Sequence, residues 1–358
     1  MKIKIRALAV CLAVCLLLPL ALTACGGGGE VVLSYKNVRL TEDIYRYWLA
    51  CYRAQFYHSE TDKTIADFAA LAEENIKRSV ICVGLFDDYG LQLDTAARDT
   101  VEAALERLVE NAGGKAALEE QAAAFGITYK GLKNAIAYEQ KAAALRQYLF
   151  GEGGVYSVSE SEKSDFYKEN YARVQMIYIP HVNFVLDDDG NRVFNPQTGS
   201  YEYESKSGAE IAAQKEKAAA VRAAAADGMD EKEFLDLMKL YNEDKSAESY
   251  PNGYYFTRLA TDTSYIQDLP AAATDMKIGE MREVKSEYGV HFLLRLAPED
   301  GGYSKAENAD FFENFDTFVM EQAFFTVISS ELKNVTAHEA KNGIRYEDTE
   351  PNFDLYWG

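Results

Sequence analysis

The pattern of hydrophobic and polar positions divides the chain into a helical first part, a mixed middle part and a helical last part. At the start, Val31, Leu33 and Tyr35 alternate with the period of two that is typical of a strand, which we expect over Glu30–Leu40. Longer apolar periodicities then predict helices over Thr41 to about Tyr57, Thr64–Tyr89, Asp94–Asn111, Gly114–Phe125 and Thr128–Leu149.

Cap residues mark the ends of these helices. Gly90 and Gly126 lie where a glycine often ends a helix, and Asp94 and Thr128 lie where a side chain often caps the first turn. The first helix is unusually aromatic. We expect most of its rings in a core, although some could form an apolar cradle for unfolded chains.

The middle part begins with a pattern that predicts strands. Arg173–Ile179 has the β-branched and aromatic content of a strand. Phe184–Leu186 and Val193–Phe194 flank an Asp-Gly sequence, which predicts a hairpin with a tight turn. A second hairpin is expected at Asn195–Tyr203.

Helices follow these strands. An alanine-rich helix is expected over Ala209–Ala225, and Asp230 with Glu233 forms the capping box of the next one. An irregular segment, 241–256, then leads to a short helix over Ala271–Met276. The helix after the capping box carries an apolar stripe made of Phe234, Leu237, Met238 and Tyr241.

The stretch Ile278–Leu296 is predicted to form two strands joined by a turn at Tyr288-Gly289. In the second strand, alternate residues share a face that should point toward a core, and His291 lies on the opposite face. Taken alone, His291 is more simply interpreted as a solvated strand histidine. The residues on the core face are Val290, Phe292, Leu294 and Leu296.

The last part is predicted to be one long helix over Glu307–Lys333, with phenylalanines at helical spacing. A helix this apolar must be buried. The tail from Ile344 could add an edge strand or a lid, and its pattern supports no firm prediction.

The first residues have the pattern of a secretory signal. Three basic residues precede an apolar run over Ala7–Leu22, which is short for a membrane-spanning helix. The run ends in Leu22-Thr23-Ala24-Cys25, which resembles the bacterial lipobox. The resemblance implies a signal peptide over residues 1–24, a lipid on the Cys25 thiol and a glycine spacer up to residue 30. A plain signal peptide followed by an unmodified cysteine is the alternative.

Charge and cysteine content narrow the function classes. The formal charge is −20, and it becomes about −23 once the three basic residues of the signal are removed. A mature protein with this negative charge is not expected to bind nucleic acid, whose phosphate backbone is also negative. Cys51 and Cys82 lie in apolar helical patterns and are predicted to be buried free thiols. The acidic run Asp187–Asp189 lacks the ligand spacing of a calcium loop, and we expect neither a metal nor a cofactor.

The order of elements in the first part resembles the amino-terminal chaperone region of the extracytoplasmic foldases PrsA and SurA. The middle part resembles a parvulin-type peptidyl-prolyl isomerase domain more specifically. Three motifs in the family's order carry this likeness: YNEDKSAE at 241–248, IGEM at 278–281 and SEYGVHFLLRL at 286–296.

The resemblance implies an α+β fold. It implies a helical chaperone domain that is built from residues 31–170 and completed by 303–358. The parvulin-like domain, a small antiparallel sheet flanked by helices, is then inserted between them as residues 171–298. The implied protein is anchored by lipid to the outer face of the cell membrane, and a homodimer is compatible with it.

Carried over residue by residue, the resemblance also implies a site. His291 matches the histidine of the final strand, Asp244 the acidic or cysteine residue of the loop, and Ser286 a hydroxyl that bonds within the histidine network. Asp244 could equally be a turn residue that caps its own loop. The apolar cup for a proline ring falls at Phe256, Leu269, and Tyr265 or Ile266, which are equally compatible with ordinary core positions.

The sequence departs from the family pattern at one important place. The first strand of the family carries a second histidine, and here Met176 stands at that position and is expected in the substrate-binding wall. His181 lies an odd number of residues further on, so it should point to the other face. This departure argues against a two-histidine network and leaves the cup and the fold.

Three functions are compatible with these features. The first is a membrane-anchored foldase that isomerises X-Pro bonds of secreted polypeptides. The second keeps the parvulin fold for peptide binding only, as a non-catalytic holdase, and Met176 favours it. The third, a solute-binding lipoprotein, should show two lobes with repeated parallel-strand patterns, which the sequence does not show.

Overall fold

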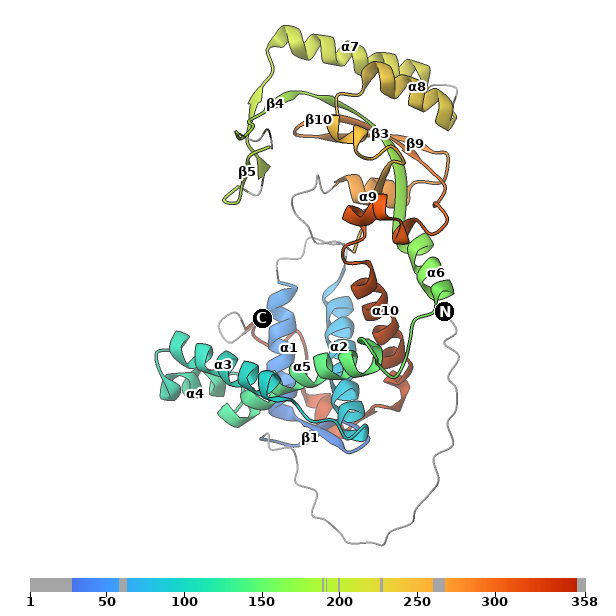
Figure 1. The fold of residues 1–358 in the computed structure, drawn as a ribbon. Coiled ribbons are helices and arrows are strands. Elements are labelled where there is room, and N and C mark those ends of the chain that lie inside the picture. Colours follow the sequence, from blue (N-terminus) through green and yellow to red (C-terminus); the bar gives the residue numbers. More distant parts are fainter. Residues whose placement is uncertain are drawn as a thin grey trace. The chain divides into compact units, whose positions relative to one another are not determined.

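The computed structural model describes residues 28–57, 63–188, 190, 192–198, 200–225, 228–259 and 268–352 (Figure 1). The signal segment, Cys25, Tyr265 and Ile266 lie outside the described residues. The chain divides into two compact units: unit 1 comprises Met1–Val158 with Met320–Gly358, and unit 2 comprises Ser159–Val319. The fold is α+β, with helices and small antiparallel sheets in both units.

Unit 1 is mainly helical, and its helices agree with those that the sequence predicts. Asp94 and Thr128 cap their helices as expected, and Thr64 caps another helix in the same way: each side chain accepts a hydrogen bond from a main-chain amide of the first turn. Gly90 and Gly126 end two of them at positive φ. The helices are α1 (Glu42–Gln55), α2 (Ile65–Asp88), α3 (Thr95–Asn111), α4 (Lys115–Ala124) and α5 (Tyr129–Phe150).

The predicted single strand over Glu30–Leu40 is wrong. The segment forms a hairpin of β1 (Val31–Tyr35) and β2 (Val38–Thr41), because Lys36 takes a positive φ of 51° and turns the chain. From the other end of the chain, β11 (Thr336–Ala337) pairs with the free edge of β1. The two ends of the chain therefore share one sheet.

Unit 2 is built on a four-stranded antiparallel sheet with the order β8-β3-β10-β9. Helices α7 and α8 cover one face and α9 covers the other, so the sheet is buried on both sides (Figure 1). The strands are β3 (Tyr171–Pro180), β8 (Tyr254–Thr257), β9 (Met281–Ser286) and β10 (Gly289–Arg295), and the helices are α7 (Gly208–Ala224), α8 (Glu231–Tyr241) and α9 (Asp268–Asp275).

Small elements extend this unit. Short strands after β3 form two ladders: β4 (Val182–Phe184) pairs with β7 (Tyr203–Ser205), and β5 (Phe194–Asn195) with β6 (Ser200–Tyr201). The second ladder agrees with the hairpin predicted at Asn195–Tyr203. The other predicted hairpin is reduced to a bridge between Leu186 and Arg192, while β4 pairs with β7 instead. The remaining elements of the unit are α6 (Glu160–Asn170), η1 (Lys245–Glu248), η2 (Gly302–Ser304) and η3 (Ala306–Phe311).

The predicted helix over Glu307–Lys333 is wrong at its beginning. The chain forms η3, breaks, and begins α10 only at Phe315, so that α10 spans Phe315–Ser330. Phe311 and Phe312 both contact Tyr255, with ring centroids 5.6 and 5.1 Å away. Neighbouring positions of a regular helix point about 100° apart, so the break lets both rings join one aromatic cluster. After α10 come η4 (Leu332–Asn334) and η5 (Glu339–Gly343).

The boundaries of the units differ from those expected from the sequence at residues 170 and 298. Helix α6 belongs to unit 2, because Tyr167 is buried beside Tyr171 and its hydroxyl accepts a hydrogen bond from the main-chain amide of Glu299 at 3.1 Å. The second boundary falls inside α10. None of the described helices is long and apolar enough to cross a membrane.

A packing constraint at Gly84 provides a test of unit 1. A Cβ at this position in α2 would lie 2.5 Å from the Tyr35 ring, so Gly84→Ala should overpack the core and cost about 1–3 kcal/mol of unfolding free energy. This loss should exceed the gain of up to about 1 kcal/mol that alanine brings to a helix. Urea denaturation followed by tryptophan fluorescence measures the change.

Gly208 at the start of α7 is the matched control. A Cβ there would meet nothing within 4 Å, so Gly208→Ala should be neutral or slightly stabilising. An equally neutral Gly84→Ala would show that Tyr35 does not pack against this position.

Candidate active site

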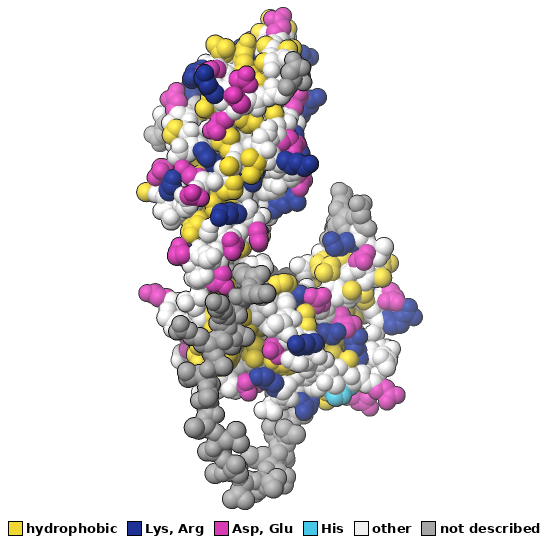
Figure 2. All heavy atoms as spheres, turned by 90° about the vertical axis from the view of Figure 1, so that its right-hand side faces the viewer, with side chains coloured by type: hydrophobic (Ala, Val, Ile, Leu, Met, Phe, Trp, Pro, Cys, Tyr) yellow, Lys and Arg dark blue, Asp and Glu magenta, His cyan; other side chains and the backbone are white. Residues whose placement is uncertain are grey.

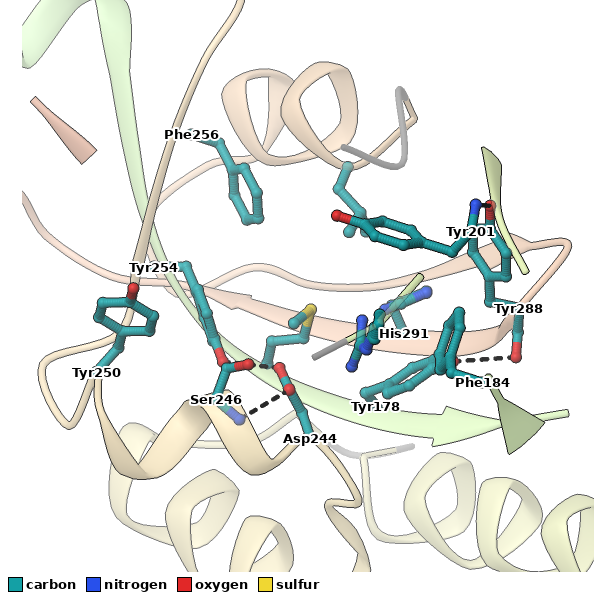
Figure 3. A pocket seen from close by; sticks show the side chains of 13 residues that line it. Tyr178, Phe184, Tyr201, Asp244, Ser246, Tyr250, Tyr254, Phe256, Tyr288 and His291 are labelled. Atoms are coloured by element: carbon teal, nitrogen blue, oxygen red, sulfur yellow. Dashed lines mark hydrogen bonds between the residues drawn. The ribbon is translucent and has the colours of Figure 1, made fainter. Parts of the chain in front are cut away.

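A cavity of about 280 Å³ opens on the face of the sheet that α9 covers (Figure 3). Strands β3, β8 and β10 supply its floor, and the loop before η1 and the hairpins after β3 supply its sides. The lining residues are Met176, Tyr178, Phe184, Arg192, Tyr201, Asp244, Ser246, Tyr250, Tyr254, Phe256, Leu269, Tyr288 and His291.

His291 lies at the centre of this cavity. It is on the opposite face of β10 from Val290 and Phe292, as the alternation predicts, but it is only 2% exposed. The interpretation as a solvated histidine is therefore wrong, because helices pack on both faces of the central strand. Gly289 starts this strand at a position where a Cβ would lie 2.3 Å from the carbonyl oxygen of Ile179, which explains why glycine precedes the Val-His pair.

The turn before β10 supplies the hydrogen-bond partner of the imidazole. Ser286 Oγ and His291 Nε2 are 3.1 Å apart, and Ser286 Oγ also accepts a hydrogen bond from the main-chain amide of Tyr288 at 3.2 Å. The other ring nitrogen of His291, Nδ1, is buried without a hydrogen-bond partner among the described residues. Ser286 is not among the residues that line the cavity, and it contacts the cavity only through His291.

Burial sets the charge state of His291. Loss of solvent lowers its pKa to about 4, against an opposing effect of the Asp244 carboxylate and with a smaller lowering by the Arg192 guanidinium. The imidazole is therefore neutral at pH 7. A neutral imidazole can donate one hydrogen bond and accept another.

Asp244 lines the cavity and also caps its own loop, as its interpretation as a turn residue expects. Its Oδ1 accepts a hydrogen bond from the main-chain amide of Ser246 at 3.1 Å, and its Oδ2 accepts one from the Tyr254 hydroxyl at 2.7 Å (Figure 3). The carboxylate is thus held in place by one bond at each oxygen.

Three of the predicted apolar residues form one wall of the cavity. Met176, Phe256 and Leu269 all line it and are almost fully buried. They also belong to the core between the sheet and α9, so they serve both structure and cavity. The other two predicted members of the cup, Tyr265 and Ile266, lie outside the described residues.

The partner of His291 across the sheet differs from the expected one. Met176 pairs with Leu293, whereas the residue opposite His291 is Tyr178. The Tyr178 ring stacks on the imidazole, with centroids 4.6 Å apart and planes 14° apart. His181 does not line the cavity, which agrees with the odd offset that separates it from Met176.

Sequence reasoning also missed the aromatic side of the cavity. Phe184, Tyr201 and Tyr288 meet there, with the Phe184 and Tyr288 ring centroids 5.2 Å apart. Arg192 lies over the Phe184 ring at 4.3 Å. The predicted hairpins contain Phe184 and Tyr201, and Tyr288 lies in a predicted turn, but nothing in the local pattern indicated that the hairpins fold over the site.

Metal chemistry has no candidate ligand set in the part of the chain that the structure describes. No group of three or more His, Cys, Asp or Glu residues is arranged there to hold an ion.

Comparison with known proteins finds likenesses among solved structures. No protein-family model and no curated protein matches the sequence. PrsA from Bacillus subtilis matches with 18% identity over 75% of this chain and 83% of its own, at a TM-score of 0.23. The foldase protein PrsA from Streptococcus pneumoniae matches with 14% identity over 90% of this chain and 100% of its own, at a TM-score of 0.26.

The chain is similar to PrsA. A third PrsA structure, from Lactococcus lactis, matches with 13% identity over 90% of this chain and 100% of its own, at a TM-score of 0.25. These matches agree with the resemblance stated from the sequence. Their identities and TM-scores are too low to transfer residue roles to this chain.

The charge state of His291 provides a test by pH. Because the pKa of this residue is near 6.5 in an unfolded chain and about 4 in the fold, the unfolded state binds more protons between these values. The free energy of unfolding should therefore decrease by on the order of 3 kcal/mol as the pH falls through this window, because His291 must stay neutral in the fold. Long-range ¹H–¹⁵N NMR of the imidazole, assigned with His291→Gln, measures the pKa directly.

Wild type should lose more stability than His291→Gln between pH 6.5 and pH 4. A titration of His291 close to pH 6.5 would contradict its burial.

Proposed function

We propose that the chain is an extracytoplasmic folding factor in which unit 2 is a peptidyl-prolyl cis-trans isomerase of the parvulin type. One observation carries the proposal. His291, Asp244 and three apolar side chains, which lie far apart in the sequence, line a single cavity, and Ser286 hydrogen-bonds the histidine. The apolar wall offers a place for a proline ring, and the polar groups face it.

The chemistry of this reaction suits such a cavity. Rotation about a peptide bond faces a barrier of about 18–20 kcal/mol, because the C–N bond has partial double-bond character. An X-Pro bond isomerises in tens to hundreds of seconds without a catalyst. A catalyst needs no covalent step: it must bind the twisted amide more tightly than either planar form.

The cavity residues can divide this work. Met176, Phe256 and Leu269 would hold the proline ring and exclude water. As resonance is lost, the amide nitrogen regains its lone pair and becomes a better hydrogen-bond acceptor. The neutral His291, bonded to Ser286, would be one of the fixed polar groups that respond to this change. No proton needs to leave the protein in such a step.

The other parts of the chain suit a folding factor. Unit 1 exposes several large hydrophobic side chains, which could hold unfolded secreted polypeptides: Tyr57, Ile65, Tyr89, Tyr148, Val155 and Phe325. On the face drawn in Figure 2, hydrophobic side chains reach the surface between acidic and basic ones. A lipid on Cys25 would hold the protein at the outer face of the membrane.

A second candidate, the non-catalytic holdase, is favoured by a specific observation. Both oxygens of Asp244 already accept hydrogen bonds from Ser246 and Tyr254, and Met176 replaces the second histidine of the family that the chain resembles. A cavity with these features could bind proline-containing segments without accelerating their isomerisation.

A proline-limited refolding assay separates the two candidates. The purified mature protein should accelerate refolding of the client, and His291→Ala should reduce kcat/KM by about 10²-fold, which is usual for the loss of one preorganised polar group. Asp244→Ala should also reduce it, because it removes the cap of the loop and a charge beside His291. Rates are compared with those of the uncatalysed client.

Asp236→Ala is the control for this assay, since Asp236 is an exposed aspartate on α8 outside the cavity and should leave the rate unchanged. Background rates for wild type and both cavity variants would rule out the isomerase. Suppression of client aggregation by the same samples would then identify the holdase.

The lipid anchor is tested separately. Cys25→Ser should move the protein from the membrane fraction to the soluble fraction of cells that express it, because the thiol that carries the lipid is lost. Mass spectrometry of the amino-terminal peptide checks the modification itself. Retention of Cys25→Ser in the membrane fraction, together with an unmodified wild-type peptide, would contradict the anchor.

A further inference from the structure

Tyr178, the residue opposite His291, has no part in the function proposed above, although several contacts fix its position. Tyr178 of β3 is 4% exposed and stacks on the imidazole of His291, its direct neighbour across the ladder (Figure 3). The imidazole has a hydrogen bond to Ser286 at one nitrogen only. A ring held at one atom can still tilt about that bond, and the stacked phenol removes this freedom.

The phenol is fixed at its tip as well as at its face. The Tyr178 hydroxyl donates a hydrogen bond to the carbonyl oxygen of Tyr288 at 3.1 Å. Tyr288 lies in the turn that carries Ser286, and its own hydroxyl accepts a hydrogen bond from the main-chain amide of Tyr201 at 3.1 Å. Tyr178 is thereby tied to the same turn that supplies the hydrogen-bond partner of His291.

The main chain of Tyr178 holds the other polar group of the cavity. Its amide donates to Asn242 Oδ1 at 2.8 Å, and the same oxygen accepts from the amide of Asp244 at 3.1 Å. Its carbonyl oxygen accepts from the amide of Glu243 at 2.9 Å. The loop before η1, which begins where α8 ends, is thus joined to β3 at this one residue.

We propose that Tyr178 is a positioning residue, whose ring sets the plane of the His291 imidazole and whose main chain, through Asn242, sets the place of Asp244. The inference deepens the isomerase function proposed above and rests on it. Tyr178, and not Met176, is the neighbour of His291 across the ladder, because Met176 lies opposite Leu293. One residue of β3 thereby places two groups that come from distant parts of the chain.

Two substitutions at Tyr178 separate the ring from the hydroxyl. Tyr178→Leu removes the stack, and we expect kcat to fall by about ten- to a hundredfold with a smaller change in KM, since the misplaced imidazole still leaves the proline wall intact. Tyr178→Phe keeps the ring and should recover most of this loss. Asn242→Ala should lower kcat by releasing the Asp244 loop.

NMR of the His291 imidazole supplies a readout that does not depend on activity. Tyr178→Leu admits water beside the ring, so the pKa of His291 should rise from about 4 toward 6.5, with Asp244 and Arg192 still facing it. Tyr178→Phe should keep the low pKa. Asn242→Ala should leave the ring stack unchanged and shift the pKa much less than Tyr178→Leu does.

Tyr303→Leu is the matched control. Tyr303 stacks on Phe315 in unit 2 with centroids 4.6 Å apart and planes 17° apart, close to the geometry of the Tyr178 stack, and it does not line the cavity. Its replacement should leave kcat and the His291 pKa unchanged. Circular dichroism and a dispersed NMR spectrum check that each variant is folded.

The outcomes decide the inference in both directions. It is overturned if Tyr178→Leu keeps the wild-type pKa of His291, or if Tyr178→Phe loses as much activity as Tyr178→Leu. A wild type without isomerase activity would remove the proposed function, whereas the NMR comparison would still show whether Tyr178 places the histidine. The inference is supported if the pKa of His291 rises in Tyr178→Leu and stays low in Tyr178→Phe and Tyr303→Leu.

Discussion

Burial of the four-stranded sheet on both faces is the constraint on which the rest of unit 2 depends. One face packs Val290 and Phe292 of β10 against α7 and α8, and the other packs Leu293 against α9. A polar side chain on the central strand must then be satisfied inside the protein or remain partly unbonded. His291 is in this position, and its neutral state follows from the desolvation.

The cavity is organised by a few hydrogen bonds between aromatic hydroxyls and fixed acceptors. Tyr254 holds the Asp244 carboxylate, and Tyr178 is held by the carbonyl oxygen of Tyr288. Buried hydroxyls of this kind need partners, so each ring is oriented by its tip as well as by packing. An apolar wall and a set of oriented polar groups result, and this combination is typical of a ligand-binding pocket.

Features that depend on neighbouring residues could be predicted from the sequence, and those that depend on distant residues could not. The caps at Asp94 and Thr128 bond amides only three residues away, and the prediction was correct. The break before α10 was missed, because it follows from the packing of Phe311 and Phe312 on a strand more than fifty residues earlier. The hairpin at Lys36 was missed because a single positive φ leaves no periodic signal.

For the site, the motifs identified His291, Asp244 and Ser286 as residues of interest and placed His291 correctly on one side of its strand. Successive side chains of a strand point to opposite faces because of the local backbone geometry, so the sequence alone predicts which residues share a face. The tertiary structure alone decided that this side is buried, that the histidine is neutral and that Tyr178 faces it. Register and desolvation arise only when β3, β10 and the helices come together, because they are properties of the surroundings that other parts of the chain provide.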